Sequence, residues 1–497
     1  MDAPETPCLL ADVLLMHART TPAATALQFE GVACSYGLLA AECERASRRL
    51  WFGWGVRPGD RVAWLGGNHP AQIALLFALA RIGAILLPLN TRLAPAEWDA
   101  QLQACAPMHL VHEGAFAAVA REVAVRNDMR DHPFDELVRD EGDVEAPQVA
   151  QPESPVLLVF TSGTTGRPKA AVHTQANLLA NMRIASHAQA ITPHDVVATM
   201  LPLFHVGGLC IQTLPALYVG AKVILLPRFT PDAAFDCFER DNPTLTLQVP
   251  ATMKALIDHP RWARANLTRL RAVWAGSSVL PAPLVDAFLR RGLAVCNVYG
   301  ATETGPFSIA LAPQNASTHA GSCGWPATGV EVQLAAVKDG AGEVWIRAAN
   351  VARRYWPDQP ACDREGWFHT GDLASCADDG SYTIVGRSKD LIISGGENIH
   401  PAQIEDALAM HPSVAECAAF ALPDERWGEV VAIAVVLRAD RGTAQQALQD
   451  ELHGFLASRL AKFKLPRRWF FMDALPRTAL GKVQRGELVQ RSFDGAL

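Results

Sequence analysis

The sequence contains no C-x-x-C pair, although it has 11 cysteines. The closest two, Cys34 and Cys43, are too far apart for a zinc ribbon or a redox-active dithiol. An odd number of cysteines without a spacing pattern is typical of a reducing compartment, where buried thiols act as small apolar side chains. We therefore expect a cytoplasmic protein without structural disulfides.

Long hydrophobic runs and an excess of basic residues are also missing. The most apolar stretch, residues 73–87, is interrupted by Arg81 and stopped by Pro88, short of the roughly 18 apolar residues that a membrane-spanning helix needs. The first five residues carry acidic rather than basic charge, which argues against a secretory signal. With 44 Lys and Arg against 51 Asp and Glu, the net charge of −7 gives no electrostatic basis for nucleic-acid binding. We expect neither a transmembrane segment nor a nucleic-acid partner.

What the sequence does contain is enough apolar material for a large core. Hydrophobic residues make up 49% and charged residues 19% of the 497 positions, which fits a globular enzyme of several domains. Strand-like apolar runs lie at residues 61–66, 84–88, 196–200, 222–226, 244–249, 271–275 and 294–299. Helical patterns lie between some of them, at residues 71–82 and 283–291. This alternation predicts an α/β fold of mostly parallel sheets covered by helices.

Two later regions have a different pattern. Residues 324–384 contain shorter apolar runs, such as 343–347 and 382–385, divided by Gly and Asp turns, which predicts a small antiparallel module. Beyond a charged segment at 386–390, the sequence shows one helical pattern, 444–460, and strand-like runs at 414–422, 430–437 and 469–472. We predict a large N-terminal domain, residues 1–387, and a small mobile α+β C-terminal domain, residues 388–497.

The strongest local chemical signal directly follows the apolar run 156–160. Glycines let backbone N–H groups approach an anion closely, hydroxyl groups add donors and a lysine adds positive charge, as triphosphate binding requires. The segment is not a Walker A loop, because Arg167 and Pro168 break that spacing. The residues that supply these groups are Thr161, Ser162, Gly163, Thr164, Thr165, Gly166 and Lys169.

This loop resembles the phosphate loop of the adenylate-forming superfamily, which holds acyl-CoA synthetases, firefly-type luciferases and peptide-synthetase adenylation domains. One departure is visible, because Ala170 follows Lys169 where the family usually has glycine. Further segments of the family pattern occur in order along the whole chain. The resemblance implies that the chain uses Mg²⁺ and ATP to convert a carboxylic acid into an acyl-adenylate.

The resemblance also assigns roles around the nucleotide. It implies that Tyr299 stacks on adenine, that Thr302 contacts the adenylate phosphate and that Glu303 holds Mg²⁺; a hard carboxylate oxygen suits this ion, and an aromatic face suits a purine. It implies that Asp372 accepts hydrogen bonds from both ribose hydroxyls, with Arg387 reaching the same sugar. The other residues implied in nucleotide binding are Gly276, Ser277, Ser278, Gly300 and Ala301, although the family more often has glycine in place of Ser277.

Residues 476–482 resemble the loop that carries the catalytic lysine of the family. Lys482 would stabilise the charge that develops as the carboxylate attacks the α-phosphate. Lys389 falls at the family's domain hinge. The resemblance further implies that Trp427 and the segment Ser394, Gly395 and Gly396 contact coenzyme A after the small domain rotates. By charge alone, candidates for the nucleotide end of coenzyme A are Lys462, Lys464, Arg467 and Arg468.

The acyl substrate is indicated by the segment around His205, a residue that we also expect to act in catalysis. Amino-acid-adenylating domains usually carry Asp in its place, so the sequence disfavours an amino acid, and the length of the chain favours free coenzyme A as acceptor. The implied acyl pocket has small residues, apolar walls and no fixed cation: His205, Val206, Gly207, Gly208, Val249, Gly276, Ala301, Gly305 and Pro306. Such walls suit a fatty or aromatic monocarboxylate whose tail carries no charge.

The sequence therefore predicts an acyl-CoA synthetase that transfers the acyl group from an acyl-adenylate to coenzyme A and releases AMP and pyrophosphate. An aromatic dicarboxylate ligase, such as a succinylbenzoate–CoA ligase, is the first alternative. A light-emitting oxidase and a non-catalytic nucleotide-binding protein are two others.

Overall fold

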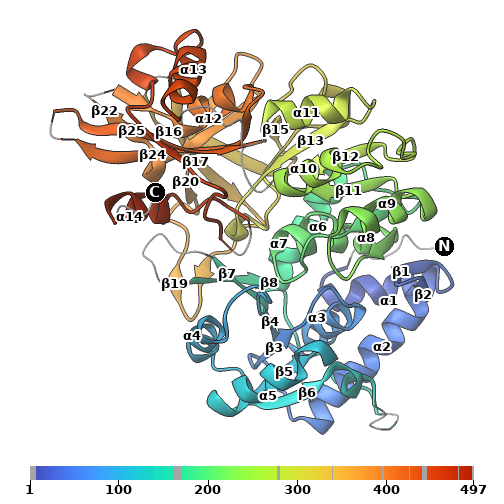
Figure 1. Ribbon diagram of the computed structural model, residues 1–497. Helices are drawn as coiled ribbons and strands as arrows, with labels where there is room; N and C mark the ends of the chain where they lie inside the picture. The colour runs from blue at the N-terminus through green and yellow to red at the C-terminus, as the bar shows by residue number, and fades with distance from the viewer. Residues whose placement is uncertain are drawn as a thin grey trace.

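The computed structural model describes residues 7–139, 142, 144–161, 169–276, 280–338, 340–394, 397–424, 426–438, 445–478 and 481–494. Within these residues the strands form four sheets, and helices cover the two largest (Figure 1). The predicted α/β architecture, with a small antiparallel module and a smaller C-terminal part, is confirmed.

The first large sheet contains the strands on either side of the predicted phosphate loop. Its central strands run parallel, whereas β7 and β8 are antiparallel and pair Thr161 with Lys169. The sheet order is β19 (Gln359–Pro360), β18 (Arg354–Tyr355), β8 (Lys169–Thr174), β7 (Pro155–Thr161), β4 (Ile85–Pro88), β3 (Arg61–Leu65), β5 (His109–His112) and β6 (Arg130–Pro133).

The second large sheet delivers the predicted adenine and metal segment. Its central strands are parallel and closely match the runs predicted from the sequence. The sheet order is β15 (Trp325–Pro326), β14 (Ile309–Ala310), β13 (Val295–Tyr299), β12 (Ala272–Ala275), β11 (Leu245–Gln248), β9 (Val196–Thr199), β10 (Lys222–Leu225), β1 (Thr25–Phe29) and β2 (Val32–Ser35).

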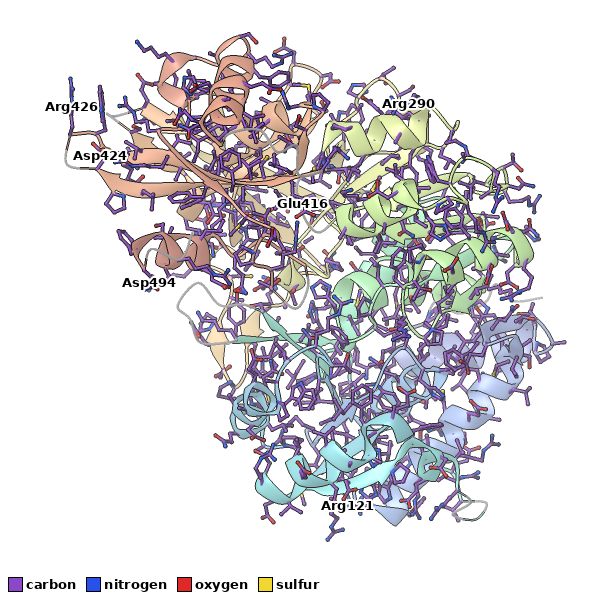
Figure 2. The ribbon with its side chains drawn as sticks, viewed as in Figure 1. Arg121, Arg290, Glu416, Asp424, Arg426 and Asp494 are labelled. Carbon is purple, nitrogen blue, oxygen red and sulfur yellow. The ribbon has the colours of Figure 1, made fainter. Side chains whose placement is uncertain are left out.

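Helices fill the space between the two large sheets and cover their outer faces. The largest apolar cluster lies between the sheets and includes residues of α1 (Leu10–Thr20), α2 (Tyr36–Arg48), α3 (Pro70–Ile82), α6 (Gln175–Ala188) and α8 (Leu214–Val219). The outer faces carry α4 (Pro95–Cys105) and α5 (Ala117–Arg126) on one sheet, and α9 (Pro231–Arg240), α10 (Pro250–Asp258) and α11 (Ala282–Leu289) on the other. Arg121 of α5 and Arg290 after α11 project outward at distant points of the surface (Figure 2).

Helix α3 explains the apolar stretch that stood out in the sequence. Proline at its first turn favours helix initiation, and Gly83 ends it in a left-handed conformation with φ of 72°. Ten of its thirteen residues are buried, because the helix is enclosed between layers rather than lying on a surface. Among the described helices, none combines the length and apolarity that crossing a bilayer would require.

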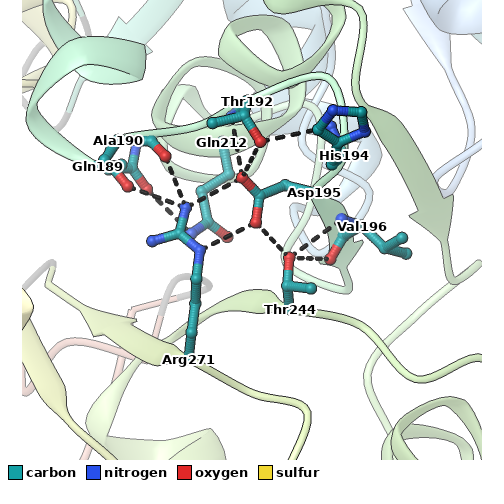
Figure 3. A network of polar contacts seen from close by, with 9 residues as sticks. All are labelled: Gln189, Ala190, Thr192, His194, Asp195, Val196, Gln212, Thr244 and Arg271. Atoms are coloured by element: carbon teal, nitrogen blue, oxygen red, sulfur yellow. Dashed lines mark hydrogen bonds and ion pairs between the residues drawn. The ribbon is translucent and has the colours of Figure 1, made fainter.

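A polar network joins the amino ends of three parallel strands (Figure 3). Asp195 directly precedes β9, and its carboxylate accepts hydrogen bonds from Arg271 Nε at 2.9 Å and Thr244 Oγ1 at 2.7 Å. Arg271 and Thr244 directly precede β12 and β11. Because this network occupies the amino ends, the carboxyl ends of the same strands remain for ligand contacts, as is general in parallel sheets.

The predicted antiparallel module is a four-stranded sheet of β16 (Val330–Lys338), β17 (Ala341–Ala348), β20 (Phe368–Cys376) and β21 (Tyr382–Arg387). Residues 324–384 are not a single unit, however. Strands β18 and β19 leave the module and extend the first large sheet, where Tyr355 pairs with Ala171 of β8. This pairing places Tyr355 beside β8, the strand that follows the predicted phosphate loop.

The C-terminal part has its own sheet and two apolar clusters. Its strands are β22 (Ile392–Ser394), β23 (Glu397–Ile399), β24 (Val414–Asp424), β25 (Gly428–Leu437) and β26 (Arg468–Phe471), and its helices are α12 (Pro401–Ala409), α13 (Gln445–Ala457) and α14 (Arg485–Phe493). A short 3-10 turn, η7 (Ser388–Asp390), connects β21 to this part and contains the predicted hinge residue Lys389.

Candidate active site

The residues that directly follow β12 and β13, Gly276 and Gly300, lie so close to neighbouring main-chain atoms that glycine is required at both positions. A Cβ on Gly300 would lie 1.7 Å from the carbonyl oxygen of Pro306, and a Cβ on Gly276 would lie 2.6 Å from that of Val298. Both distances are far below any real contact of a Cβ atom. The segment η5 (Thr302–Thr304), which carries Glu303, therefore begins from a tightly fixed turn.

One group of predicted nucleotide-binding residues forms a connected chain. The Tyr299 hydroxyl donates to Asp372 Oδ2 at 2.8 Å, and Arg387 Nε lies 2.8 Å from Asp372 Oδ1. Asp372 on β20 and Arg387 on β21 are also direct partners in the sheet register. Burial, with a further contribution from Asp372, raises the pKa of Tyr299 well above its usual value, so its hydroxyl stays a hydrogen-bond donor. The three residues are thus held around one carboxylate.

A second group joins the predicted metal ligand to the phosphate-loop lysine. The Tyr355 hydroxyl donates to Glu303 Oε1 at 2.9 Å, and the Lys169 Nζ lies 5.2 Å from the centre of the Tyr355 ring. Glu303 is only 8% exposed. Burial raises the pKa of Tyr355, and the neighbouring Glu303 raises it further. Lys169 and Glu303, predicted from separate motifs, are therefore brought together by a residue that neither motif contains.

The small domain contributes Lys482 to the same region. Burial lowers its pKa; Arg387 and Lys389 lower it further, whereas Asp372 and Glu303 oppose them. Lys482 is nevertheless accessible to solvent, so it reaches an open space in which charges of the large domain act on it. A cation close to Glu303 and Asp372 stands where negative charge on a nucleotide would be stabilised.

His205 lies within the electrostatic reach of Lys482. Burial lowers the pKa of His205 to about 4, and Lys482 contributes in the same direction, so the imidazole is neutral at pH 7. Its Nδ1 accepts the Gly207 N–H at 3.0 Å, which leaves the proton on Nε2. His205 therefore presents a neutral N–H donor rather than a cation.

The loop that carries Lys482 is closed by its own hydrogen bonds. Thr478 N–H donates to the Lys482 carbonyl at 2.7 Å, and Arg477 Nη1 donates to the Gly481 carbonyl at 2.6 Å. Three residues further on, Arg485 contacts Glu405 of α12 at 2.7 Å and Asp390 of η7 at 3.5 Å. These contacts connect the lysine loop to the hinge turn within the small domain.

The residues at the site fit a magnesium ion. Mg²⁺ is usually held by one or two carboxylates together with phosphate oxygens and water. Glu303 offers a buried carboxylate of which one oxygen already accepts a hydrogen bond, and Lys169 stands nearby to balance phosphate charge. Within the described ranges no cluster of three or more His, Cys, Asp or Glu side chains could hold a metal ion by itself.

Two of the residues predicted to contact coenzyme A lie close to each other in the small domain: Ser394 ends β22, and Trp427 directly precedes β25. Ser394 of β22 pairs with Gly428 of β25, directly after Trp427. Arg467 lies 4.8 Å from the Trp427 ring and, with Arg468, lines a groove of about 520 Å³. Asp424 also lines this groove; together with Arg426 it lies at the outer tip of the β24–β25 hairpin (Figure 2).

The predicted acyl-pocket residues lie on the short helix α7 (Val206–Gly208), at the start of α10 and after η5. A Cβ on Gly208 would lie 2.3 Å from the Pro202 carbonyl oxygen. Gly305 has φ of 94°, and a Cβ at this position would lie 2.7 Å from Asn181 Oδ1 and 3.0 Å from Asn350 Nδ2. These amides fix the chain around η5, because Asn350 Nδ2 donates to the carbonyls of Thr304 and Phe307 at 2.7 and 2.9 Å.

Some predicted site residues lie outside the described part of the chain. They are Ser162, Gly163, Thr164, Thr165 and Gly166 of the phosphate loop, Ser277 and Ser278 of the adenine segment, and Gly395 and Gly396 of the coenzyme A segment.

Three residues with contacts at the site were not predicted from the sequence: Tyr355, Asn350 and Arg485. Tyr355 follows two charged residues that do not stand out in the sequence, and it reaches the site through the pairing of β18 with β8. Arg485 could have been suspected, because it stands three residues after Lys482 and opens α14. Nothing in the sequence distinguishes Asn350 from an ordinary polar residue in a turn.

The family model of the AMP-binding enzyme matches residues 14–356, and that of the AMP-binding enzyme C-terminal domain matches residues 403–482. An indoleacetate–CoA ligase of Aromatoleum aromaticum is 40% identical, covering 97% of this chain and 98% of its own. A feruloyl-CoA synthase of an Amycolatopsis species is 39% identical, covering 96% and 97%.

Solved structures agree over the same length. An anthranilate CoA ligase in complex with anthranoyl-AMP has a TM-score of 0.91 at 26% identity and covers all of both chains. The o-succinylbenzoate CoA synthetase of Bacillus subtilis in complex with ATP and magnesium has a TM-score of 0.83 at 28% identity, with coverage of 96% and 98%. The chain therefore belongs to the family of AMP-binding enzymes, as an AMP-forming carboxylate–CoA ligase that uses ATP, Mg²⁺ and coenzyme A.

Proposed function

We propose that this ligase activates a monocarboxylate whose tail is aromatic and carries no charge. Two relatives at 39% and 40% identity are named for indoleacetate and ferulate, both aromatic acids with one carboxylate. The proposed acyl pocket of His205, Val206, Gly207, Gly208, Val249, Gly276, Ala301, Gly305 and Pro306 has small and apolar residues and, at pH 7, a neutral histidine. A second carboxylate would need a cation there, since burying an unpaired charge is costly.

The observation that supports this reaction is the electrostatic influence of Glu303 and Asp372 of the large domain on Lys482 of the small domain, and of Lys482 on His205. In the first half-reaction the substrate carboxylate attacks the α-phosphorus of ATP, and pyrophosphate leaves. Lys482 stabilises the charge that develops between the carboxylate and the α-phosphate, while Lys169 acts on the phosphates. Mg²⁺, when bound, neutralises phosphate charge, and Glu303 is the residue that would hold it.

The remaining site residues position the nucleotide. Tyr299, with Gly300, Ala301 and Gly276 beside it, holds the adenine, and Thr302 contacts the α-phosphate. Asp372 and Arg387 hold the ribose. The phosphate loop adds Thr161, Ser162, Gly163, Thr164, Thr165 and Gly166, and the adenine segment adds Ser277 and Ser278. Such positioning lets an already activated acyl group react without a protein nucleophile.

In the second half-reaction the coenzyme A thiol attacks the acyl-adenylate, which gives the thioester and AMP. We place the domain boundary between residues 387 and 388, with Lys389 as the hinge, and assign Ser394, Gly395, Gly396 and Trp427 to coenzyme A. The groove beside Trp427 supports this assignment, because Arg467 and Arg468 offer two cations to the phosphates of the nucleotide end. An odd number of cysteines without a spacing pattern suits a reducing compartment, and on that ground we place the enzyme in the cytoplasm.

A substrate panel tests this proposal directly. Pyrophosphate release from Mg-ATP would be measured with indoleacetate, ferulate, benzoate, succinylbenzoate, acetate, medium- and long-chain fatty acids and several amino acids, with and without coenzyme A. We expect release with the aromatic monocarboxylates, accelerated by coenzyme A and accompanied by AMP. Stronger turnover of succinylbenzoate or of a fatty acid would contradict the proposed substrate class but not the ligase reaction.

A further inference from the structure

Tyr355 occupies a position that the two-domain reaction scheme does not explain. It is the last residue of β18 and pairs with Ala171, two residues after Lys169, on the strand that leaves the phosphate loop. Its hydroxyl donates to Glu303 Oε1 at 2.9 Å, and its ring lies 5.2 Å from Lys169 Nζ. One side chain therefore contacts both the predicted metal ligand and the predicted phosphate-binding lysine.

Glu303 is held at two points by the segment that contains Tyr355. The Ala352 N–H donates to the Glu303 carbonyl at 2.7 Å, and the Tyr355 hydroxyl fixes the carboxylate. With one oxygen bound to the phenol, rotation of the carboxylate is restricted and its second oxygen has a defined direction. Hydrogen-bonded partners of metal ligands commonly set ligand orientation in this way.

The aromatic face of the same residue acts on Lys169. A cation above an aromatic ring gains electrostatic attraction, which favours one position of an otherwise flexible side chain. Lys169 and Glu303 carry opposite charges and contact different parts of the same phenol, the ring face and the hydroxyl. Tyr355 can therefore restrain both groups at once, while each acts on a different part of a magnesium–phosphate complex.

We propose that Tyr355 is a positioning residue for Mg-ATP: its hydroxyl orients Glu303 toward the metal ion, and its ring positions Lys169 toward the phosphates. This inference rests on the proposed role of Glu303 as the magnesium ligand. It assigns no chemical step to Tyr355, which acts only through its two neighbours.

The first test is the affinity for ATP with and without Mg²⁺, measured by isothermal titration calorimetry on the full chain without acyl substrate. Tyr355→Phe removes the hydroxyl and keeps the ring, so we expect about a tenfold loss in affinity for Mg-ATP. The affinity for ATP in the presence of a chelator should stay within about twofold of the parent. A purely structural role of Tyr355 would change both affinities together.

Two further variants separate the contributions of the hydroxyl and the ring. Tyr355→Leu also removes the cation–π contact, so it should weaken metal-free ATP as well as Mg-ATP. Glu303→Asp shortens the carboxylate and withdraws it from the phenol, so it should reproduce the selective loss seen with Tyr355→Phe. Because Glu303→Asp also moves the proposed metal ligand, it is compared with the double variant Glu303→Asp/Tyr355→Phe: no further loss in Mg-ATP affinity supports the positioning role, and a full additional loss contradicts it.

Tyr36→Phe is the matched control. Tyr36 is fully buried and its hydroxyl donates to the Ala221 carbonyl at 2.8 Å, outside the site. We expect a lower melting temperature for this variant but unchanged affinity for both forms of ATP.

Glu303→Gln distinguishes a failure of the positioning role of Tyr355 from a failure of the metal-binding role of Glu303. If Glu303→Gln weakens Mg-ATP but Tyr355→Phe does not, the positioning role of Tyr355 is wrong and the role of Glu303 stands. If neither variant changes the affinity for Mg-ATP, the assignment of Glu303 as the metal ligand is wrong, and the inference fails with it.

Discussion

At the scale of single residues, the site depends on charges that the fold places against each other. Lys482 is flanked by two other cations, Arg387 and Lys389, and by two carboxylates, Asp372 and Glu303. The cations and burial lower its pKa, whereas the carboxylates favour its charged form. Such a site is electrostatically prepared for a polyanion, because added phosphate charge relieves the repulsion among the cations.

Lys482→Ala should therefore abolish the first half-reaction selectively. We expect adenylate formation, followed as pyrophosphate release, to fall on the order of 10²–10³-fold, because one preorganised charge is lost at the reacting phosphate. Thioester formation from supplied acyl-adenylate should be spared. Lys338→Ala, at an exposed lysine on β16, is the control and should change neither rate. An equal loss of both half-reactions would refute this division of labour.

At the scale of elements, the site is assembled from turns that tolerate no side chain. The β13–η5 turn passes so close to the segment after η5 that Gly300 has no space for a Cβ next to Pro306. Amides of Asn181 and Asn350 then fill the volume around Gly305. The main chain of Thr302 and Glu303 is thus positioned by the packing of this turn.

Gly300→Ala should displace this turn. The added methyl group would meet a backbone oxygen, so we expect a loss of about 1–3 kcal/mol in the free energy of unfolding, measured by urea denaturation. Adenylation should fall further than the stability loss explains, because Thr302 and Glu303 move. Gly454→Ala in α13 is the matched change: nothing lies within 4 Å of its Cβ position, and it should be neutral or stabilising by up to about 1 kcal/mol. Full activity of Gly300→Ala would show that the turn does not position the site.

At the scale of the whole molecule, the small domain is oriented so that Lys482 faces the large one. The η7 turn between them is held by the Ser388 hydroxyl, which donates to the Gly371 carbonyl at 3.1 Å, and by Asp390, which pairs with Arg485. Rotation about Lys389 would carry the Lys482 loop and α14 away together, because Arg485 links them to the hinge turn.

Lys389→Pro should stall the second half-reaction while adenylation continues. Proline fixes φ near −65°, so the hinge loses the freedom that rotation requires. We expect thioester formation to fall by about tenfold or more and pyrophosphate formation in a single turnover to stay near that of the parent. Lys389→Ala removes the charge but keeps the backbone free, and it should support both half-reactions. Unchanged overall turnover of the proline variant would mean that the hinge lies elsewhere.

Much of the fold and part of the site could be read from the sequence. Parallel strands buried on both faces are continuous apolar runs, so β3, β9 and β12 were predicted to within one or two residues. The chemistry of the phosphate loop indicated Lys169, whereas Glu303, Asp372 and Lys482 were assigned through the resemblance of successive segments to the family pattern. No pattern in the sequence could show that β18 leaves the antiparallel module, because that pairing depends on β8, which is almost two hundred residues away in the chain.

The sequence by itself determined the α/β class, the order of the motifs and the kinds of chemical groups available, since these follow from local periodicity and residue type. Only the tertiary structure decided which groups meet. It placed Tyr355 in contact with both Glu303 and Lys169, joined Tyr299 and Arg387 to one carboxylate, and brought Lys482 within the electrostatic reach of His205. Contacts of this kind depend on sheet pairing and domain orientation, which long-range packing fixes and local sequence does not.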